Sequence, residues 1–294
     1  MPIHNLPIFQ SNPKLLKGNV QIIACAGSGK TEFVSERIAY QIQQGIAKPS
    51  EIVALTFNEA AAEELKFRVR DKITELMGKQ PDIGDMYIGT IHAFAFNILK
   101  DFVPKYRGYD MLDEKSRKAF AVSLMWKDGI NIPALYGSLK NRGFKYNPYF
   151  ASSNPSYWQN WTLGSFLDDV DFCREESITS GKMASETFKN SYQVYLDKLD
   201  ERKFLDFSGI LTLAVHYLEN DPYIVKQIQK QFKFFTIDEY QDVNPIQEKL
   251  IRLVSGQKNV CVVGDDDQSI YQWRGADVKN IIDFNINYKA VTIH

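Results

Sequence analysis

A glycine-rich segment near the N-terminus has the residue types that bind a nucleotide phosphate. It runs Ala24-Cys25-Ala26-Gly27-Ser28-Gly29-Lys30-Thr31, between an apolar stretch and a helical pattern. Backbone N–H groups of such a turn, at a helix N-terminus, converge on phosphate oxygens. Lys30 is placed to reach the β- and γ-phosphates and Thr31 to bind Mg²⁺. The alternative is a glycine turn without a ligand.

A second segment, far along the chain, carries paired carboxylates at the end of an apolar strand. It runs Ile237-Asp238-Glu239-Tyr240-Gln241-Asp242. One carboxylate there can hold Mg²⁺ through water, and another can orient and deprotonate an attacking water. We assign Asp238 to the metal and Glu239 to the base, with Asp242 and Gln247 as supporting or helix-capping residues. The alternative is a solvated acidic turn.

A third segment follows another apolar strand and mixes carboxylates, amides and aromatic rings. It runs from Gly264 to Gly275, and Gln268 within it is suited to sensing a γ-phosphate. Tyr271 and Trp273 alternate with polar residues next to Arg274. Aromatic faces stack bases without regard to sequence, and arginine adds phosphate contact. Because α/β sheets bind ligands at the ends of their strands, all three segments predict one site.

Composition limits the class of protein. The chain has 294 residues, 44% hydrophobic and 24% charged, as in an ordinary globular protein. No apolar run of about eighteen residues predicts a membrane span, and the N-terminus lacks a secretory signal pattern. Cys25, Cys173 and Cys261 are not closely paired, which argues against a disulfide framework or a zinc site and favours a cytoplasmic protein. The formal net charge of −1 means that any nucleic-acid surface is local.

The apolar periodicity predicts alternating strands and helices. We expect strands at 20–24, 52–57 and 86–89, and helices at 31–44, from a cap at Asn58 onward, and at 91–102. Further strands are expected at 232–237, 260–263 and 290–293. This order is typical of a parallel sheet with crossover helices.

The middle of the chain has a different pattern. From 105 to 202 it shows helical periodicity, at 116–127, 163–176 and 184–203, and no convincing strand, while 147–161 is predicted as loop. The predicted organisation is therefore an α/β core domain formed by 1–104 and 203–294, with an inserted all-α subdomain at 105–202.

Several motifs together resemble one family. These are Ala-Gly-Ser-Gly-Lys-Thr at 26–31, Leu-Thr-Phe-Asn-Glu-Ala-Ala at 55–61, Gly-Thr-Ile-His-Ala-Phe at 89–94, Asp-Phe at 206–207, the acidic segment at 237–242, and Gly-Asp-Asp-Asp-Gln-Ser-Ile-Tyr-Gln-Trp-Arg-Gly-Ala at 264–276. In order and spacing the chain resembles the N-terminal half of a UvrD/Rep/PcrA-type superfamily 1 DNA helicase. That resemblance implies a RecA-like P-loop NTPase fold, ATP and Mg²⁺ as cofactors, and 3′→5′ movement on single-stranded DNA or on duplex with a 3′ tail.

The resemblance also implies individual roles. Gln10 is placed like the family glutamine that contacts adenine. Thr56, Phe57, Thr90 and His92 fall where relatives touch single-stranded DNA, and Tyr271 and Trp273 would be the base-stacking pair. For His92 alone, a buried, hydrogen-bonded histidine is the other interpretation. The patch Lys140, Arg142, Phe144, Lys145 and Tyr146 is equally compatible with a DNA contact and with a solvated helix end.

The chain departs from the family at several positions. Glu59 and Ala60 stand where relatives commonly have Asn and Lys, which removes a phosphate contact or adds a repulsion. Glu32 stands where several relatives have an arginine that stacks on adenine. Cys25 replaces a common glycine.

The resemblance further implies a second RecA-like domain, which these 294 residues do not contain. Arginines of such a domain increase the rate of ATP hydrolysis by roughly 10³–10⁵. We therefore expect this chain alone to bind ATP but to hydrolyse it slowly and not to unwind DNA. Two other hypotheses remain open: a non-motor ATP-binding switch or interaction module, and the helicase part of a RecB/AddA-like helicase–nuclease. DNA repair is one of several pathways that fit.

Overall fold

The computed structural model describes residues 9, 12–25, 28–78, 82–127, 155–175, 186–265 and 279–293. The chain divides into two compact units, one formed by 1–97 with 214–294 and the other by 98–213. The division falls within helices α4 (Ile91–Phe102) and α10 (Phe207–Asn220), and each unit is described by itself.

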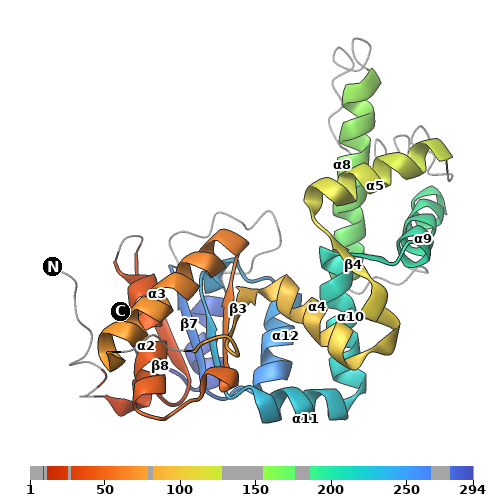
Figure 1. The fold of residues 1–294 in the computed structure, drawn as a ribbon. Coiled ribbons are helices and arrows are strands. Elements are labelled where there is room, and N and C mark those ends of the chain that lie inside the picture. The colour runs from red at the N-terminus through yellow and green to blue at the C-terminus, as the bar shows by residue number, and fades with distance from the viewer. Residues whose placement is uncertain are drawn as a thin grey trace. The chain divides into compact units, whose positions relative to one another are not determined.

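The first unit is built on a six-stranded sheet (Figure 1). Its strand order is β3-β2-β6-β7-β1-β8, and all five neighbouring pairs are parallel. The strands are β1 (Val20–Ile23), β2 (Ile52–Thr56), β3 (Tyr87–Thr90), β6 (Phe234–Ile237), β7 (Val260–Gly264) and β8 (Val291–Ile293). Because the strands are parallel, their carboxyl ends all lie along one edge of the sheet.

Two helices cover one face of this sheet. They are α2 (Lys30–Gln43) and α3 (Glu59–Met77), which lie side by side in Figure 1. Alternate strand residues such as Val20, Ile22 and Ala54 point to this face and join the buried stripes of both helices in one core. As predicted, Asn58 caps α3, its side chain accepting a hydrogen bond from Ala61 N at 2.8 Å.

The other residues of the same strands, such as Val53, Leu55 and Val262, are equally buried on the opposite face. Right-handed crossovers place α12 (Pro245–Ser255), between β6 and β7, on this side. Asn244 and Gln247 form a reciprocal capping box at its start, with bonds of 3.0 and 3.1 Å, which confirms the predicted capping role of Gln247. A sheet covered on both faces explains why its strands are continuous apolar runs.

Shorter elements connect these layers. They are the 3₁₀ turns Pro13–Leu15, Pro49–Glu51 and Tyr240–Asp242, and the helices α11 (Pro222–Gln231), α13 (Lys279–Ile282) and α14 (Phe284–Tyr288); the 3₁₀ turn Pro104–Gly108 belongs to the second unit. None of the helices within the described residues has the length and apolarity that crossing a membrane requires.

The second unit is mainly helical. It contains α5 (Glu114–Lys127), α8 (Pro155–Glu175) and α9 (Glu186–Glu201), whose buried residues, among them Phe120, Phe166 and Tyr195, form one core. The prediction of an all-α segment at 105–202 is wrong in one respect, since β4 (Asp110–Leu112) pairs in parallel with β5 (Phe204–Asp206). A strand of three residues is too short to show the alternation of apolar and polar residues that predicts a strand, and its partner strand is remote in sequence.

Most predicted elements are confirmed with ends shifted by one or two residues, and the helix predicted at 91–102 is observed with those bounds. The loop predicted at 147–161 is wrong over 155–161, because Pro155 begins α8 there. Proline is favoured in the first turn of a helix, so Pro155, which the prediction treated as a loop residue, marks the start of a helix instead.

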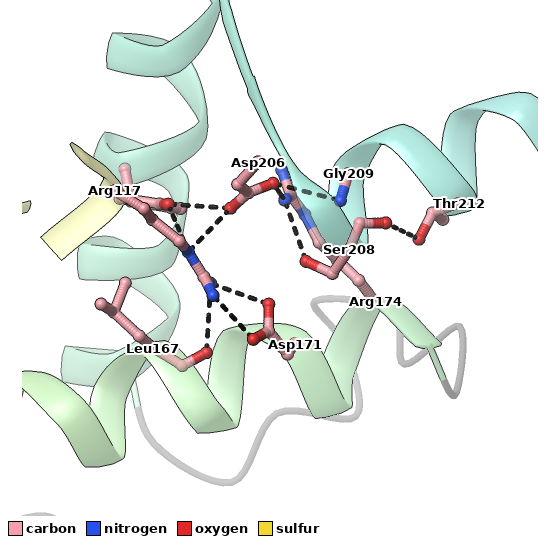
Figure 2. A network of polar contacts seen from close by, with 9 residues as sticks. Arg117, Leu167, Asp171, Arg174, Asp206, Ser208, Gly209 and Thr212 are labelled. Atoms are coloured by element: carbon pink, nitrogen blue, oxygen red, sulfur yellow. Dashed lines mark hydrogen bonds and ion pairs between the residues drawn. The ribbon is translucent and has the colours of Figure 1, made fainter. Parts of the chain in front are cut away.

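A buried ion network holds the second unit together (Figure 2). Asp206 is fully buried and accepts hydrogen bonds from Tyr195 Oη at 2.8 Å, from Gly209 N at 3.1 Å and from Arg174. Arg117 Nε lies 3.2 Å from the same carboxylate, and its terminal nitrogens donate to Asp171 at 2.7 Å. Burial opposes the charged form, but Arg174 and Arg117 hold the pKa of Asp206 below its usual range. The network joins α5, α8, α9 and the start of α10.

We expect Asp206→Asn to destabilise the second unit by roughly 3–5 kcal/mol, because it leaves Arg117 and Arg174 buried without their shared counter-charge. Segment-resolved hydrogen exchange should show lost protection in α5, α8 and α9 and unchanged protection in the sheet of the first unit. The matched control is Glu201→Gln, which removes an exposed pair with Lys198 at 2.8 Å and should cost less than about 1 kcal/mol. Equal effects of the two substitutions would show that the network is not a stabilising element.

Candidate nucleotide-binding site

The phosphate-loop segment leaves the sheet at the carboxyl end of β1. Ala24 N donates to Gly264 O at 3.0 Å, which extends the β1–β7 pairing by one residue. Gly29 then has φ of +93°, a conformation that L side chains rarely adopt, and α2 begins at Lys30. Ser28 folds back on the turn, its hydroxyl donating to Cys25 O at 2.6 Å. The N-terminus of α2 therefore lies at the edge where the other strands end, and the first N–H groups of any helix have no partner within the helix.

The acidic segment leaves the sheet at the end of β6, two strands away. Asp238 N donates to Leu55 O at 2.9 Å, and Glu239 takes a left-handed conformation with φ of +51°. Such a backbone costs about 1–2 kcal/mol for a residue with a Cβ, so the surroundings must hold it. Tyr240 does so: it is fully buried, and its hydroxyl donates to Glu248 of α12.

These two segments meet in space. Lys30 Nζ lies 3.5 Å from Glu239 Oε2, and the lysine side chain is only 9% exposed while that of Glu239 is 40% exposed. Gln241 Nε2 donates to the same carboxylate oxygen at 2.7 Å. The arrangement is a lysine and a carboxylate, at the start of a helix and the end of a strand, with one side open to solvent.

Two carboxyl groups beside this pair bind protons more readily than exposed ones. Burial, and next the charge of Glu239, raise the pKa of Asp238 to about 6 and that of Asp242 to about 6. Asp242 Oδ1 is also buried without a hydrogen-bond partner among the described residues, which is a cost that water or a cation's hydration shell would relieve.

These groups fit Mg²⁺. The cation usually takes one or two carboxylates and completes its shell with waters and substrate phosphates. Asp238 and the Thr31 hydroxyl are the groups that would hold it, with Asp242 nearby. The described residues contain no cluster of three or more acidic, histidine or cysteine side chains that would form an all-protein metal cage.

A second group of predicted residues lies at the neighbouring strand ends of the same edge. Thr56 and Thr90 are register partners of β2 and β3, and His92 follows in the first turn of α4. Thr90 Oγ1 donates to Glu59 Oε1 at 3.2 Å. Burial lowers the pKa of His92 to about 4, so it is neutral at pH 7 and can donate or accept a hydrogen bond but adds no positive charge.

The departure at Glu32 also has a structural partner. Glu32 lies in the first turn of α2, with Lys72 Nζ at 2.6 Å and Arg68 at 3.5 Å, both from α3. A carboxylate at this position is therefore compensated by cations of the neighbouring helix.

The structure thus places part of the predicted site and leaves another part outside the described residues. Placed at the carboxyl edge are Ser28, Gly29, Lys30, Thr31, Thr56, Phe57, Thr90, His92, Asp238 and Glu239. Gln10, Ala26, Gly27, Gln268, Tyr271, Trp273 and Arg274, as well as the patch at 140–146, lie outside the described residues.

Sequence reasoning gave no role to Gln241, although the structure places it in contact with Glu239. The available signal was its position two residues beyond a strand-end carboxylate, where a 3₁₀ turn returns the side chain toward that carboxylate. Glu59 was identified as a departure, but its bond to Thr90 depends on the alignment of β2 with β3.

The parallel sheet covered by helices on both faces, with a lysine loop and an acidic loop on one edge, is consistent with a RecA-like domain. The UvrD/REP helicase N-terminal domain family matches residues 8–289, and the chain belongs to this family. It is 30% identical over 294 residues to the ATP-dependent DNA helicase PcrA of Bacillus subtilis (strain 168), covering 98% of this chain and 36% of that protein.

It is also 30% identical over 279 residues to the ATP-dependent DNA helicase PcrA of Staphylococcus aureus (strain Mu50), covering 94% of this chain and 35% of the relative. The chain therefore spans about a third of the length of these relatives. Membership of the family implies ATP binding.

Proposed function

We propose that this chain is the ATP·Mg²⁺-binding portion of an ATP-dependent 3′→5′ DNA helicase or translocase that acts on single-stranded DNA. The observation that carries the proposal is the meeting of Lys30 and Glu239 at 3.5 Å on the edge where six parallel strands end. The family match and its PcrA relatives support the choice of ATP and DNA as ligands.

In this proposal each group of the edge has a separate task. Lys30 binds the β- and γ-phosphates, and the backbone N–H groups at the start of α2 bind their oxygens. Thr31 and Asp238 hold Mg²⁺, which when bound neutralises charge developing on the phosphates. Glu239 accepts the proton of the water that attacks the γ-phosphorus, and Gln268 senses that phosphate.

The ion pair between Lys30 and Glu239 has a consequence for this cycle. Phosphate oxygens and Glu239 compete for the same ammonium group, so nucleotide binding draws Lys30 away and leaves the carboxylate available as a base. Hydrolysis by these 294 residues alone is proposed to be slow, because groups that stabilise the transferred phosphoryl charge are supplied from outside them.

Single-stranded DNA is proposed to cross the ends of β2 and β3, over Thr56, Phe57, Thr90 and His92, with Tyr271, Trp273 and Arg274 adding stacking and phosphate contact. Residues 105–202 are proposed to be a subdomain inserted into the ATP-binding core formed by 1–104 and 203–294. A second RecA-like domain and DNA with a 3′ single-stranded tail are the proposed partners.

Titration with a fluorescent ATP analogue and Mg²⁺ tests the nucleotide site. We expect Lys30→Ala to weaken binding roughly 10- to 100-fold, because it removes a charged contact worth about 1.5–3 kcal/mol. The matched control is Lys66→Ala, which removes an exposed lysine of α3 paired with Glu63 at 2.6 Å and should leave the affinity unchanged. Failure of the unsubstituted chain to bind the analogue would refute the proposal.

Repeating the titration with an oligonucleotide separates a motor from a non-motor switch. In a motor, binding of the oligonucleotide changes the affinity for the nucleotide; in a non-motor switch it does not.

Glu59→Gln tests the DNA path. Because Glu59 places a carboxylate beside Thr90, its neutralisation should strengthen binding of a labelled oligo-dT about three- to tenfold at low salt, measured by fluorescence anisotropy. Glutamine still accepts the Thr90 hydrogen bond, so the local structure is retained. The control is Glu63→Gln, one turn along α3 and paired with Lys66. If both substitutions change the affinity equally, the effect is one of net charge and the path does not cross Glu59.

A further inference from the structure

We propose that Gln241 is a positioning residue for ATP hydrolysis: it holds the carboxylate of Glu239 in place and ties it to the end of β7. This inference rests on the proposed function, because it concerns the residue assigned there as the base. It adds a role for a side chain that touches neither the phosphates nor the metal in that assignment.

The contacts of Gln241 join two strand ends. Its Nε2 donates to Glu239 Oε2 at 2.7 Å, and its Oε1 accepts from Asp265 N at 3.1 Å. The first contact lies in the loop after β6, and the second is the backbone directly after β7. One side chain therefore fixes the distance between the base and the neighbouring strand end.

The chemistry of both partners requires an amide at position 241. The Asp265 N–H can only donate, so it fixes which end of the amide carries the oxygen. The NH₂ end is then directed at a carboxylate, which can only accept when ionised. A glutamate would face Glu239 with a second negative charge, and an aliphatic side chain would make neither bond.

The packing around Gln241 leaves it little freedom. The side chain is 2% exposed, and a Cβ added at Gly264 would lie 2.4 Å from its Oε1. Glycine at the end of β7 therefore makes room for this amide. A buried side chain with both ends bonded is suited to holding a neighbour in one orientation.

The proposed competition between Glu239 and phosphates for Lys30 shows when the contact with Gln241 matters. Glu239 Oε2 contacts both Lys30, at 3.5 Å, and Gln241, at 2.7 Å. Once phosphates draw Lys30 away, the bond from Gln241 keeps the Glu239 carboxylate in the same position. Gly264 O also accepts from Ala24 N, so the same strand end is bonded to the phosphate-loop segment and to the support of the base.

Single-turnover hydrolysis tests this role, with the chain in excess over radiolabelled ATP and the nucleotide affinity measured in parallel. We expect Gln241→Met to slow hydrolysis roughly 10- to 100-fold while the dissociation constant changes less than twofold, since a small misplacement of a reacting group is costly. The matched control is Gln229→Met, which removes another bridging glutamine, bonded to Leu253 O at 2.8 Å, and should leave both quantities unchanged.

Gln241→Glu supplies a readout that a role in packing alone would not change. Glutamate has nearly the shape of glutamine and still accepts from Asp265 N, but an ionised glutamate cannot donate to Glu239 and repels it. At pH 8 hydrolysis should therefore be as slow as in Gln241→Met, whereas a packing role would leave the rate of this near-isosteric variant unchanged.

The outcomes separate this inference from the proposed function. Hydrolysis at the unsubstituted rate by Gln241→Met or by Gln241→Glu would overturn the positioning role. So would a rate for the unsubstituted chain no higher than that of Glu239→Gln, since Glu239 would not be the base. Nucleotide binding in those samples would leave the nucleotide site standing, whereas its absence in the unsubstituted chain would remove the proposed function itself.

Discussion

The attraction between Lys30 and Glu239 depends on one geometric constraint, the parallel direction of the strands that precede them. β1 ends two strands away from β6, with β7 between them, so the loops that follow all leave from the same edge. A reversed strand would send one loop to the far edge and separate the lysine from the carboxylate by the length of a strand. Burial of both sheet faces beneath helices maintains that direction, which is why the apolar core supports the polar site.

At this edge the loops are also bonded to one another. Asp238 N pairs with β2, Ala24 N pairs with β7, and Gln241 joins the acidic loop to Asp265. The left-handed backbone at Glu239 is unfavourable, and so is the burial that raises the pKa of Asp238. The hydrogen bonds between the loops offset both. The edge thus holds a strained carboxylate loop beside a lysine, an arrangement that phosphates and a cation would stabilise in the proposed function.

Much of this organisation follows from local signals in the sequence. Long apolar periods predicted the strands and helices of the sheet to within a few residues, and glycines with a lysine before a helix predicted the phosphate loop. The convergence of Lys30 with Glu239 was predictable because parallel strands share an edge. What the sequence did not predict depends on contacts between remote segments: the three-residue pairing of Asp110–Leu112 with Phe204–Asp206, the ion pairs of Asp206 with Arg117 and Arg174, and the bond of Gln241 to Asp265. In each of these contacts the two partners lie more than twenty residues apart, so no local pattern contains both.

The central claim is that one ammonium group is shared between Glu239 and a nucleotide. The most direct measurement is a crystal structure of this chain with Mg²⁺ and a non-hydrolysable ATP analogue. We expect Lys30 Nζ to lie within hydrogen-bond distance of phosphate oxygens and to have left Glu239, which stays bonded to Gln241. An analogue bound elsewhere on the molecule, or a Lys30 still paired with Glu239 in the complex, would contradict the account.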